Sequence, residues 1–284
     1  MQFEDFSNEH AFGLLARYRD RYRIFNDDIQ GTGAVVTSGF INCLKVAGLE
    51  LKDVRAVFHG AGSAGVGVAD QIVSLFVENG WDVEEARKHF WFVDSRGLVT
   101  DNRGDRLESH KVRFARKDAP KQLGTLTEII ADVKPNILIG LSGQGGAFSK
   151  EVIDEFQKHT TKPIIFALSN PTSAAECTAE QAYQWTDGKA IFASGSPFAP
   201  VKYKGKTFVP GQGNNMFIFP VWRALPVCAH SLSLSLSAAS SYLSSSRHVV
   251  TGSRLRRVVE PSLQGHRPHG APRRHGARRL CVRG

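Results

Sequence analysis

The feature that most constrains the fold is a cluster of glycines between an apolar run and a helical pattern. Residues 55–59 form the apolar run, Gly60, Gly62 and Gly65 follow it, and an Ala/Val-rich pattern continues over residues 66–78. In a parallel β–α–β unit, such glycines allow a tight turn, the approach of a pyrophosphate to the backbone, and close packing of helix on strand. The helix N-terminus adds N–H groups and a favourable dipole for an anion. The pattern predicts a dinucleotide-binding turn, and an ordinary tight turn is the alternative.

The same arrangement of an apolar run followed by a polar loop recurs along the chain. The further runs lie at 90–93, 136–141, 163–168 and 190–194. Helical patterns occupy 8–22, 34–47, 126–133, 149–159 and 178–184. Strands that alternate with helices predict an α/β fold, here a doubly wound, Rossmann-like parallel sheet preceded by an N-terminal helical segment. The polar loops are then expected to gather beyond the carboxyl ends of the strands, where such sheets bind ligands.

The character of the chain changes abruptly at Pro220. The 284 residues carry a net charge of +9, but residues 221–284 contain eleven Arg, no Lys and one acid, which leaves about −1 for residues 1–220. The last part is also rich in Ser, Gly and Pro, with little to bury, and is predicted to be disordered. We therefore expect metal-binding loops and a helix at 1–33, a nucleotide-binding domain at 34–220, and a low-complexity tail at 221–284.

Cysteine usage and hydropathy bear on the compartment. The four cysteines are widely spaced and include no CxxC pair, which favours reduced thiols over disulfides or a zinc site. No run of 18 apolar residues occurs, and the chain begins with acids rather than a basic, hydrophobic leader. These observations predict an intracellular protein that does not enter a membrane, most simply a cytoplasmic one, with a mitochondrial or plastid location left open.

Two short acidic loops flank the first helical pattern. Glu4 and Asp5 precede it, and Asp27 and Asp28 follow it. Carboxylates from two loops can hold a hard divalent ion such as Mg²⁺ or Mn²⁺, which prefers oxygen ligands. Alternatively, the first pair is solvated and the second caps the next helix. On spacing alone this ordinary interpretation is favoured.

Other candidate residues follow predicted strands. Asp94 ends the run at 90–93 and could accept a hydrogen bond from a ribose hydroxyl, and Ser95 and Lys111 beyond it could accommodate a 2′-phosphate. Asn170 and Asn215 lie in loops expected at the carboxyl edge, where amides can bind a substrate carboxylate or a nicotinamide ribose. Each of these residue types is also common at surfaces and in turns.

Five motifs, taken in order, carry a family resemblance: Gln2-Phe-Glu-Asp-Phe6, Phe25-Asn-Asp-Asp-Ile-Gln-Gly-Thr32, Gly60-Ala-Gly-Ser-Ala-Gly65, Leu168-Ser-Asn-Pro-Thr172 and Pro210-Gly-Gln-Gly-Asn-Asn215. Over residues 1–220 the chain resembles malic enzyme, the decarboxylating malate dehydrogenase. The resemblance reverses the preference for the ordinary interpretation of the acids. It implies metal-dependent oxidative decarboxylation of L-malate to pyruvate and CO₂ in a homo-oligomer that uses Mg²⁺ or Mn²⁺. The implied cofactor is NADP, with NAD as the alternative.

The resemblance also assigns roles to individual positions. It implies metal ligands at Glu4, Asp5 and Asp28, and a catalytic aspartate at Asp27. It implies cofactor contacts at Gly60, Gly62, Ser63, Ala64, Gly65, Asp94, Ser95, Lys111 and Asn170. Substrate contacts are implied at Asn170 and Asn215, and the pair Ser95 and Lys111 favours NADP over NAD.

Two departures from the family pattern leave alternatives open. No residue matches the family's general-base lysine, general-acid tyrosine or carboxylate-binding arginine, so a dinucleotide-binding fragment without turnover is the second hypothesis. The Arg-rich tail is typical of translation in another frame or through an intron. A genuine basic arm that binds nucleic acid is the less favoured alternative, so nucleic acid is not an expected partner.

Overall fold

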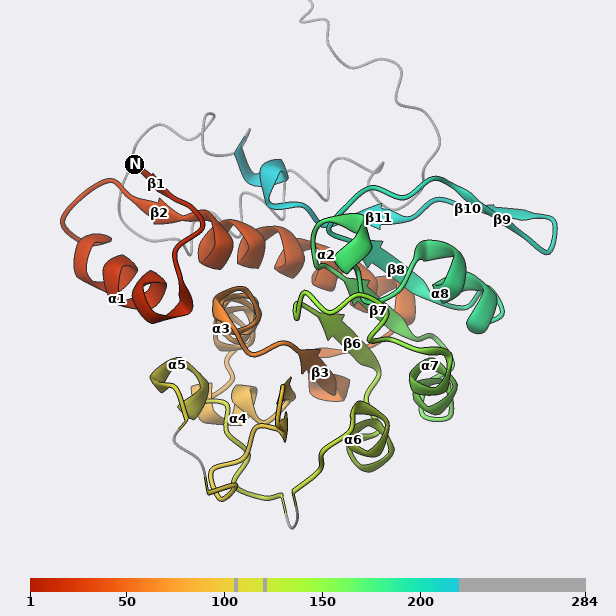
Figure 1. Cartoon of the computed structure of the whole chain (residues 1–284), viewed down its shortest axis with the longest axis horizontal. Helices are drawn as coiled ribbons and strands as arrows, with labels where there is room; N and C mark the ends of the chain where they lie inside the picture. Colours follow the sequence, from red (N-terminus) through yellow and green to blue (C-terminus); the bar gives the residue numbers. More distant parts are fainter. Residues whose placement is uncertain (105–106, 120–121, 220–284) are drawn as a thin grey trace, which may run out of the picture. The chain divides into compact units, whose positions relative to one another are not determined.

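The computed structural model describes residues 1–104, 107–119 and 122–219. Its main feature is a seven-stranded sheet (Figure 1) with the strand order β11-β8-β7-β6-β3-β4-β5. The strands are β3 (Ala56–His59), β4 (Phe90–Asp94), β5 (Gly97–Leu98), β6 (Ile137–Gly140), β7 (Ile164–Ala167), β8 (Ile191–Ser194) and β11 (Gly211–Gln212). All neighbouring pairs are parallel except β4 and β5. The predicted doubly wound parallel sheet is confirmed.

Helices cover both faces of this sheet (Figure 1). They are α1 (Asn8–Tyr18), α2 (Thr32–Ala47), α3 (Ser63–Glu78), α4 (Val83–Arg87), α5 (Ser109–Val112), α6 (Leu126–Val133), α7 (Lys150–Gln157) and α8 (Ala179–Trp185). Short 3₁₀ turns lie at η2 (Leu51–Asp53), η3 (Thr172–Ala174) and η4 (Asn215–Ile218).

The alternation of side chains along the strands produces two cores. Phe58, Ile139 and Phe166 point to the face covered by α2 and α3. Val57 and Leu138, one position earlier on two of the same strands, point to the face covered by α6, α7 and α8. Strands buried on both faces must be apolar at every position, which is why they appear in the sequence as continuous apolar runs.

The N-terminal segment differs from the predicted polar loop. β1 (Gln2–Phe3) pairs in parallel with β2 (Phe25–Asn26), and a π-helical turn, η1 (Asp27–Gly31), leads directly into α2. The Asn26 side chain stabilises this turn, since its Oδ1 accepts a hydrogen bond of 2.9 Å from the Ile29 N–H. A hairpin of β9 (Val201–Tyr203) and β10 (Lys206–Phe208) is likewise absent from the predicted elements.

Several predictions concern parts of the chain that the structure does not describe. The predicted disorder of the tail lies outside the described residues, as do Cys228 and Cys281.

Two other predictions concern described residues. Cys43 and Cys177 are buried free thiols. None of the helices in the described ranges is both long and apolar enough to cross a bilayer.

Candidate cofactor and metal site

The glycine turn after β3 has a backbone that only glycine fits at two positions. Gly60 has φ +120°, and a Cβ there would lie 2.4 Å from the Leu141 carbonyl oxygen. A Cβ on Gly65 would lie 2.2 Å from the Gly60 carbonyl oxygen. α3 begins immediately after Gly62, whose missing side chain leaves this helix end without a side-chain cap. The turn therefore has the strand, the close packing and the helix N-terminus that a pyrophosphate site needs.

A pocket of about 240 Å³ opens at the carboxyl end of the sheet. The loops that follow β6, β7 and β11, together with η1, the starts of α2 and α3, and the start of η4, contribute its lining. The lining residues are Asp28, Thr32, Ala64, Leu141, Gly143, Leu168, Ser169, Asn170, Gly213 and Asn215. The structure thus brings together four residues that were predicted separately: Asp28, Ala64, Asn170 and Asn215.

The predicted metal ligands form a compact carboxylate cluster next to this pocket. Pairing of Gln2 with Phe25 and of Phe3 with Asn26 places the first acidic loop beside the second. One oxygen each from Glu4, Asp5 and Asp28 lies within 4.8 Å of the others. The Asp5 N–H donates a hydrogen bond of 2.9 Å to Asp28 Oδ2. Three carboxylates at this spacing offer the oxygen ligands that a hard divalent ion prefers.

Asp27 lies beneath the cluster, with only 2% of its surface exposed. Its Oδ2 accepts a hydrogen bond of 2.6 Å from Asn215 Nδ2, whereas no donor in the described part of the chain bonds its Oδ1. Gly31 makes room for this carboxyl, because a Cβ there would lie 2.0 Å from Oδ1. Burial, followed by the nearby charges of Glu4 and Asp28, raises the pKa of Asp27 to about 6. An excess of partly buried negative charge fits a site that a cation would neutralise.

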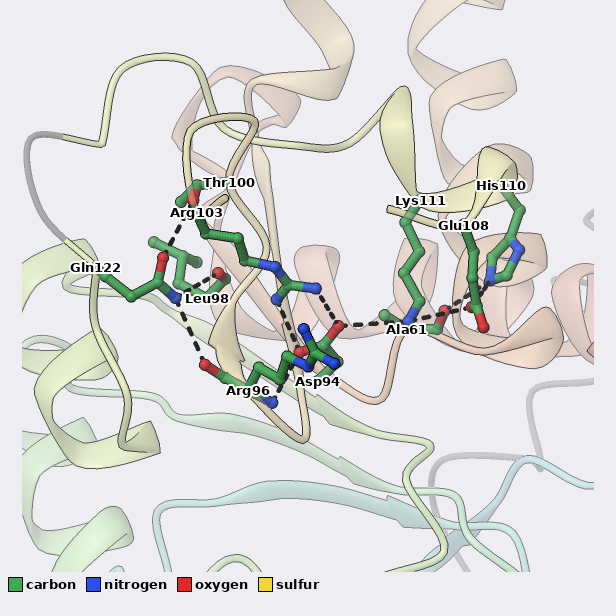
Figure 2. Close-up of polar contacts among 10 residues, drawn as sticks. All are labelled: Ala61, Asp94, Arg96, Leu98, Thr100, Arg103, Glu108, His110, Lys111 and Gln122. Carbon is green, nitrogen blue, oxygen red and sulfur yellow. Dashed lines mark hydrogen bonds and ion pairs between the residues drawn. The ribbon is translucent and has the colours of Figure 1, made fainter. Parts of the chain in front are cut away.

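Asp94 lies on the other side of the glycine turn and is engaged by cations (Figure 2). Arg103 Nη1 and Nη2 donate to its two oxygens at 2.9 and 2.8 Å, and Lys111 Nζ lies 3.3 Å from Oδ2. The Asp94 and Arg103 side chains are only 11% and 5% exposed. Burial alone would raise the pKa of Asp94, but the hydrogen bonds from Arg103 and the Arg96 N–H, with the charges of Arg103 and Lys111, hold it at about 2.

Lys111 has a second acidic neighbour at the start of its own helix, and His110 links α5 to the glycine turn. The Lys111 Nζ lies 3.1 Å from Glu108 Oε2. The adjacent His110 places its Nε2 3.1 Å from the Ala61 carbonyl oxygen, within the turn (Figure 2). Ser95 is exposed in the turn between β4 and β5. Asp94, Ser95 and Lys111 are therefore near one another but outside the lining of the pocket.

Arg103 is the main residue of this region that the sequence did not reveal. An arginine nine positions after Asp94, in a segment without regular structure, gives no periodic or motif signal. Its position opposite Asp94 depends on how the chain turns after β5. Arg96, which directly follows Ser95, was the more obvious cation in the sequence.

Comparison with known proteins decides the family. The sequence model described as "Malic enzyme, NAD binding domain" matches residues 29–248, more than half of the chain. The chain belongs to the malic enzyme NAD-binding domain family. It is 66% identical over 220 residues to the NADP-dependent malic enzyme of Dictyostelium discoideum, and 50% identical over 221 residues to a chloroplastic NADP-dependent malic enzyme of Zea mays. Each alignment covers 78% of this chain.

Solved malic enzyme structures share the fold of this domain. The crystal structure of the Entamoeba histolytica malic enzyme superposes with a TM-score of 0.59 and 27% sequence identity, over 77% of this chain and 41% of that one. The curated relatives are also longer, since the alignments cover 40% of the Dictyostelium protein and 34% of the maize protein. The chain therefore spans about two fifths or less of these relatives.

Proposed function

We propose that this malic enzyme domain binds NADP and a divalent metal ion for the oxidative decarboxylation of L-malate to pyruvate and CO₂. The observation that carries the proposal is that Asp28, Ala64, Asn170 and Asn215 line one and the same pocket. One member of the acidic cluster, the helix start of a glycine turn and two amides thus surround one space, which supports the proposal. This combination matches a reaction that needs a metal, a dinucleotide and a hydroxy acid together.

The residues divide into three groups of proposed roles. Glu4, Asp5 and Asp28 would hold Mg²⁺ or Mn²⁺, with the buried Asp27 carboxyl beside them as a candidate proton carrier. The amides of Asn170 and Asn215 would bind a substrate carboxylate or the nicotinamide ribose. A nicotinamide bound in this pocket would supply the hydride acceptor, and a metal ion held by Glu4, Asp5 and Asp28 would supply the Lewis acid that oxidative decarboxylation needs.

A preference for NADP over NAD is supported by the cations around Asp94. An unpaired carboxylate would repel a 2′-phosphate, but Arg103 and Lys111 neutralise Asp94. Ser95, exposed at the end of β4, adds a small polar side chain at the same place. The relatives from Dictyostelium and maize carry the name NADP-dependent malic enzyme. We also propose an intracellular location, supported by the buried free thiols of Cys43 and Cys177, and homo-oligomeric assembly, supported by the family resemblance.

The test uses the purified 284-residue chain. We would titrate Mn²⁺ by electron paramagnetic resonance and NADPH by its fluorescence, and then follow absorbance at 340 nm with L-malate, Mn²⁺ and NADP⁺. The matched control is the double variant Glu4→Ala/Asp28→Ala, which should lose Mn²⁺ binding and any turnover but keep NADPH binding. NADPH binding without turnover would support the alternative, a dinucleotide-binding module that is not an enzyme by itself. Absence of NADPH binding would refute both.

A further inference from the structure

A fully buried acidic side chain contacts the loops after β6 and β7, both of which line the pocket. Glu176 is 0% exposed and follows η3. Its Oε1 accepts hydrogen bonds from Ser142 N at 3.2 Å, Ser142 Oγ at 3.3 Å and Ser169 Oγ at 2.5 Å. Its Oε2 lies 3.4 Å from the Ser169 N–H that donates to it. Burying a carboxyl group is costly unless its oxygens are bonded in this way.

These hydrogen bonds join two loops that are far apart in the sequence. Ser142 lies in the loop after β6, and Ser169 lies in the loop after β7. The Ser169 hydroxyl also accepts a hydrogen bond of 2.9 Å from the Gly143 N–H. The two loops are therefore bonded to each other directly as well as through Glu176. The backbone adds one more link, since the Phe148 N–H donates to the Glu176 carbonyl oxygen at 2.9 Å.

The neighbouring strand is shaped to admit this carboxyl. A Cβ on Gly140, the last residue of β6, would lie 2.3 Å from Glu176 Cδ. Only a glycine at the end of this strand leaves the side chain enough space to reach both loops. The hydrogen bonds from Ser142 and Ser169 to Glu176 therefore depend on the absence of a side chain at Gly140.

We propose that Glu176 is a positioning residue for the nicotinamide half of the dinucleotide, acting through the loops after β6 and β7. The inference rests on the proposed cofactor function. Gly143, Ser169 and Asn170 of these loops line the pocket. In the strand order, β6 and β7 lie on one side of β3 and its glycine turn, whereas β4 with Asp94 lies on the other. Since a dinucleotide binds across such a switch point, its two halves lie on opposite sides of the turn.

The experiment compares a whole dinucleotide with its adenosine half. Isothermal titration calorimetry of the full chain would measure the Kd for NADPH and for 2′,5′-ADP, which lacks the nicotinamide. We expect Glu176→Gln to weaken NADPH binding about tenfold, because one oxygen becomes an amide donor that faces the loop donors, and to change 2′,5′-ADP binding less than about twofold. Removal of a negative charge would by itself strengthen binding of an anionic ligand, so weaker binding indicates lost geometry.

Two control variants separate positioning from general stability. Glu155→Gln removes a carboxyl on α7 that pairs with Lys158 and His159, away from the pocket. Ile153→Val removes one methylene from the core on the same helix and lowers stability without removing any hydrogen bond to Glu176. Neither control should change the ratio of the two Kd values. If Glu176→Gln does not fold, Ser142→Ala, which deletes one donor to the same carboxyl, should shift the ratio in the same direction.

The possible outcomes distinguish the inference from the function on which it rests. Selective loss of NADPH affinity in Glu176→Gln or Ser142→Ala supports the positioning role. Equal weakening of both ligands, or no change in either, overturns that role while leaving the cofactor function intact. If the unaltered chain binds neither ligand, the proposed function itself fails and the inference falls with it.

Discussion

Asn215 donates a hydrogen bond of 2.6 Å to Asp27 across 188 positions of the sequence. The contact joins η4 to the π-helical turn η1, and it brings a candidate substrate amide to the acidic cluster. Asp27 is almost completely buried, and within the described residues Asn215 is the side chain that donates a hydrogen bond to its carboxyl. This hydrogen bond therefore connects η4, near the end of the described residues, to η1 in the N-terminal segment.

Replacing this amide by a second acid should destabilise the fold. Asn215→Asp places two carboxyls at hydrogen-bond distance and removes the donor to Asp27, so we expect a loss of about 1–3 kcal/mol in the free energy of unfolding at pH 8. Urea denaturation followed by circular dichroism would measure it. The exposed Asn102→Asp makes the same chemical change at the surface and should leave stability unaltered. Equal stability of the two variants would contradict the importance of the contact.

The glycine turn gives a matched pair of alanine substitutions. Gly65→Ala would force a Cβ against the Gly60 carbonyl and is expected to cost about 1–3 kcal/mol, with a loss of NADPH binding. Gly13→Ala, in α1, meets no atom within 4 Å and should stabilise the chain by up to about 1 kcal/mol through its higher helix propensity. Urea denaturation and NADPH fluorescence would test both. A tolerated Gly65→Ala would show that the turn can relax.

The Asp94–Arg103 pair should give stability a specific dependence on pH. The folded-state pKa of Asp94 is lowered from 3.8 to about 2, so its ionised form stabilises the fold fully above 3.8 and loses this contribution as the pH falls toward 2. Arg103→Gln should therefore cost about 1–2 kcal/mol at pH 7, and this cost should shrink below pH 4. Urea denaturation at several pH values would show it, with Arg19→Gln as an exposed control. A cost independent of pH would exclude the ion pair as its source.

Lys111 should affect the choice between the two nicotinamide cofactors. Loss of its charge in Lys111→Gln is expected to weaken NADPH binding about tenfold while changing NADH binding less than about twofold, since only NADPH carries the 2′-phosphate. Calorimetric titration of both cofactors would measure the ratio. Lys45→Gln, on the exposed face of α2, is the matched control. An unchanged ratio in Lys111→Gln would refute the assignment of this lysine to NADP preference.

Local patterns predicted most of the central sheet. The apolar runs at 90–93 and 163–168 became β4 and β7, and the helical pattern at 126–133 became α6 with the same bounds. These elements are buried on a regular face or on both faces, so their composition reflects their environment directly. The β9–β10 hairpin and the π-helical turn were not predicted, because short exposed strands and irregular turns leave little periodic signal.

The candidate site was only partly accessible from the sequence. Motif order identified Asp28 and Asn170 as candidates, but spacing could not show that both line one pocket. Arg103 and Glu176 escaped notice because neither lies in a recognisable motif. Their partners, Asp94 in one case and Ser142 and Ser169 in the other, come from separate segments.

The sequence by itself determined the fold class, the family and the identities of the acids, glycines and amides. Those properties depend on composition, short-range periodicity and the order of motifs along the chain. Tertiary structure alone decided that Arg103 neutralises Asp94, that Asn215 holds Asp27, and that Glu176 joins two loops. The physical reason is that these contacts arise from chain closure between distant segments, and their distances and burial are fixed only when the sheet and its two helical layers pack.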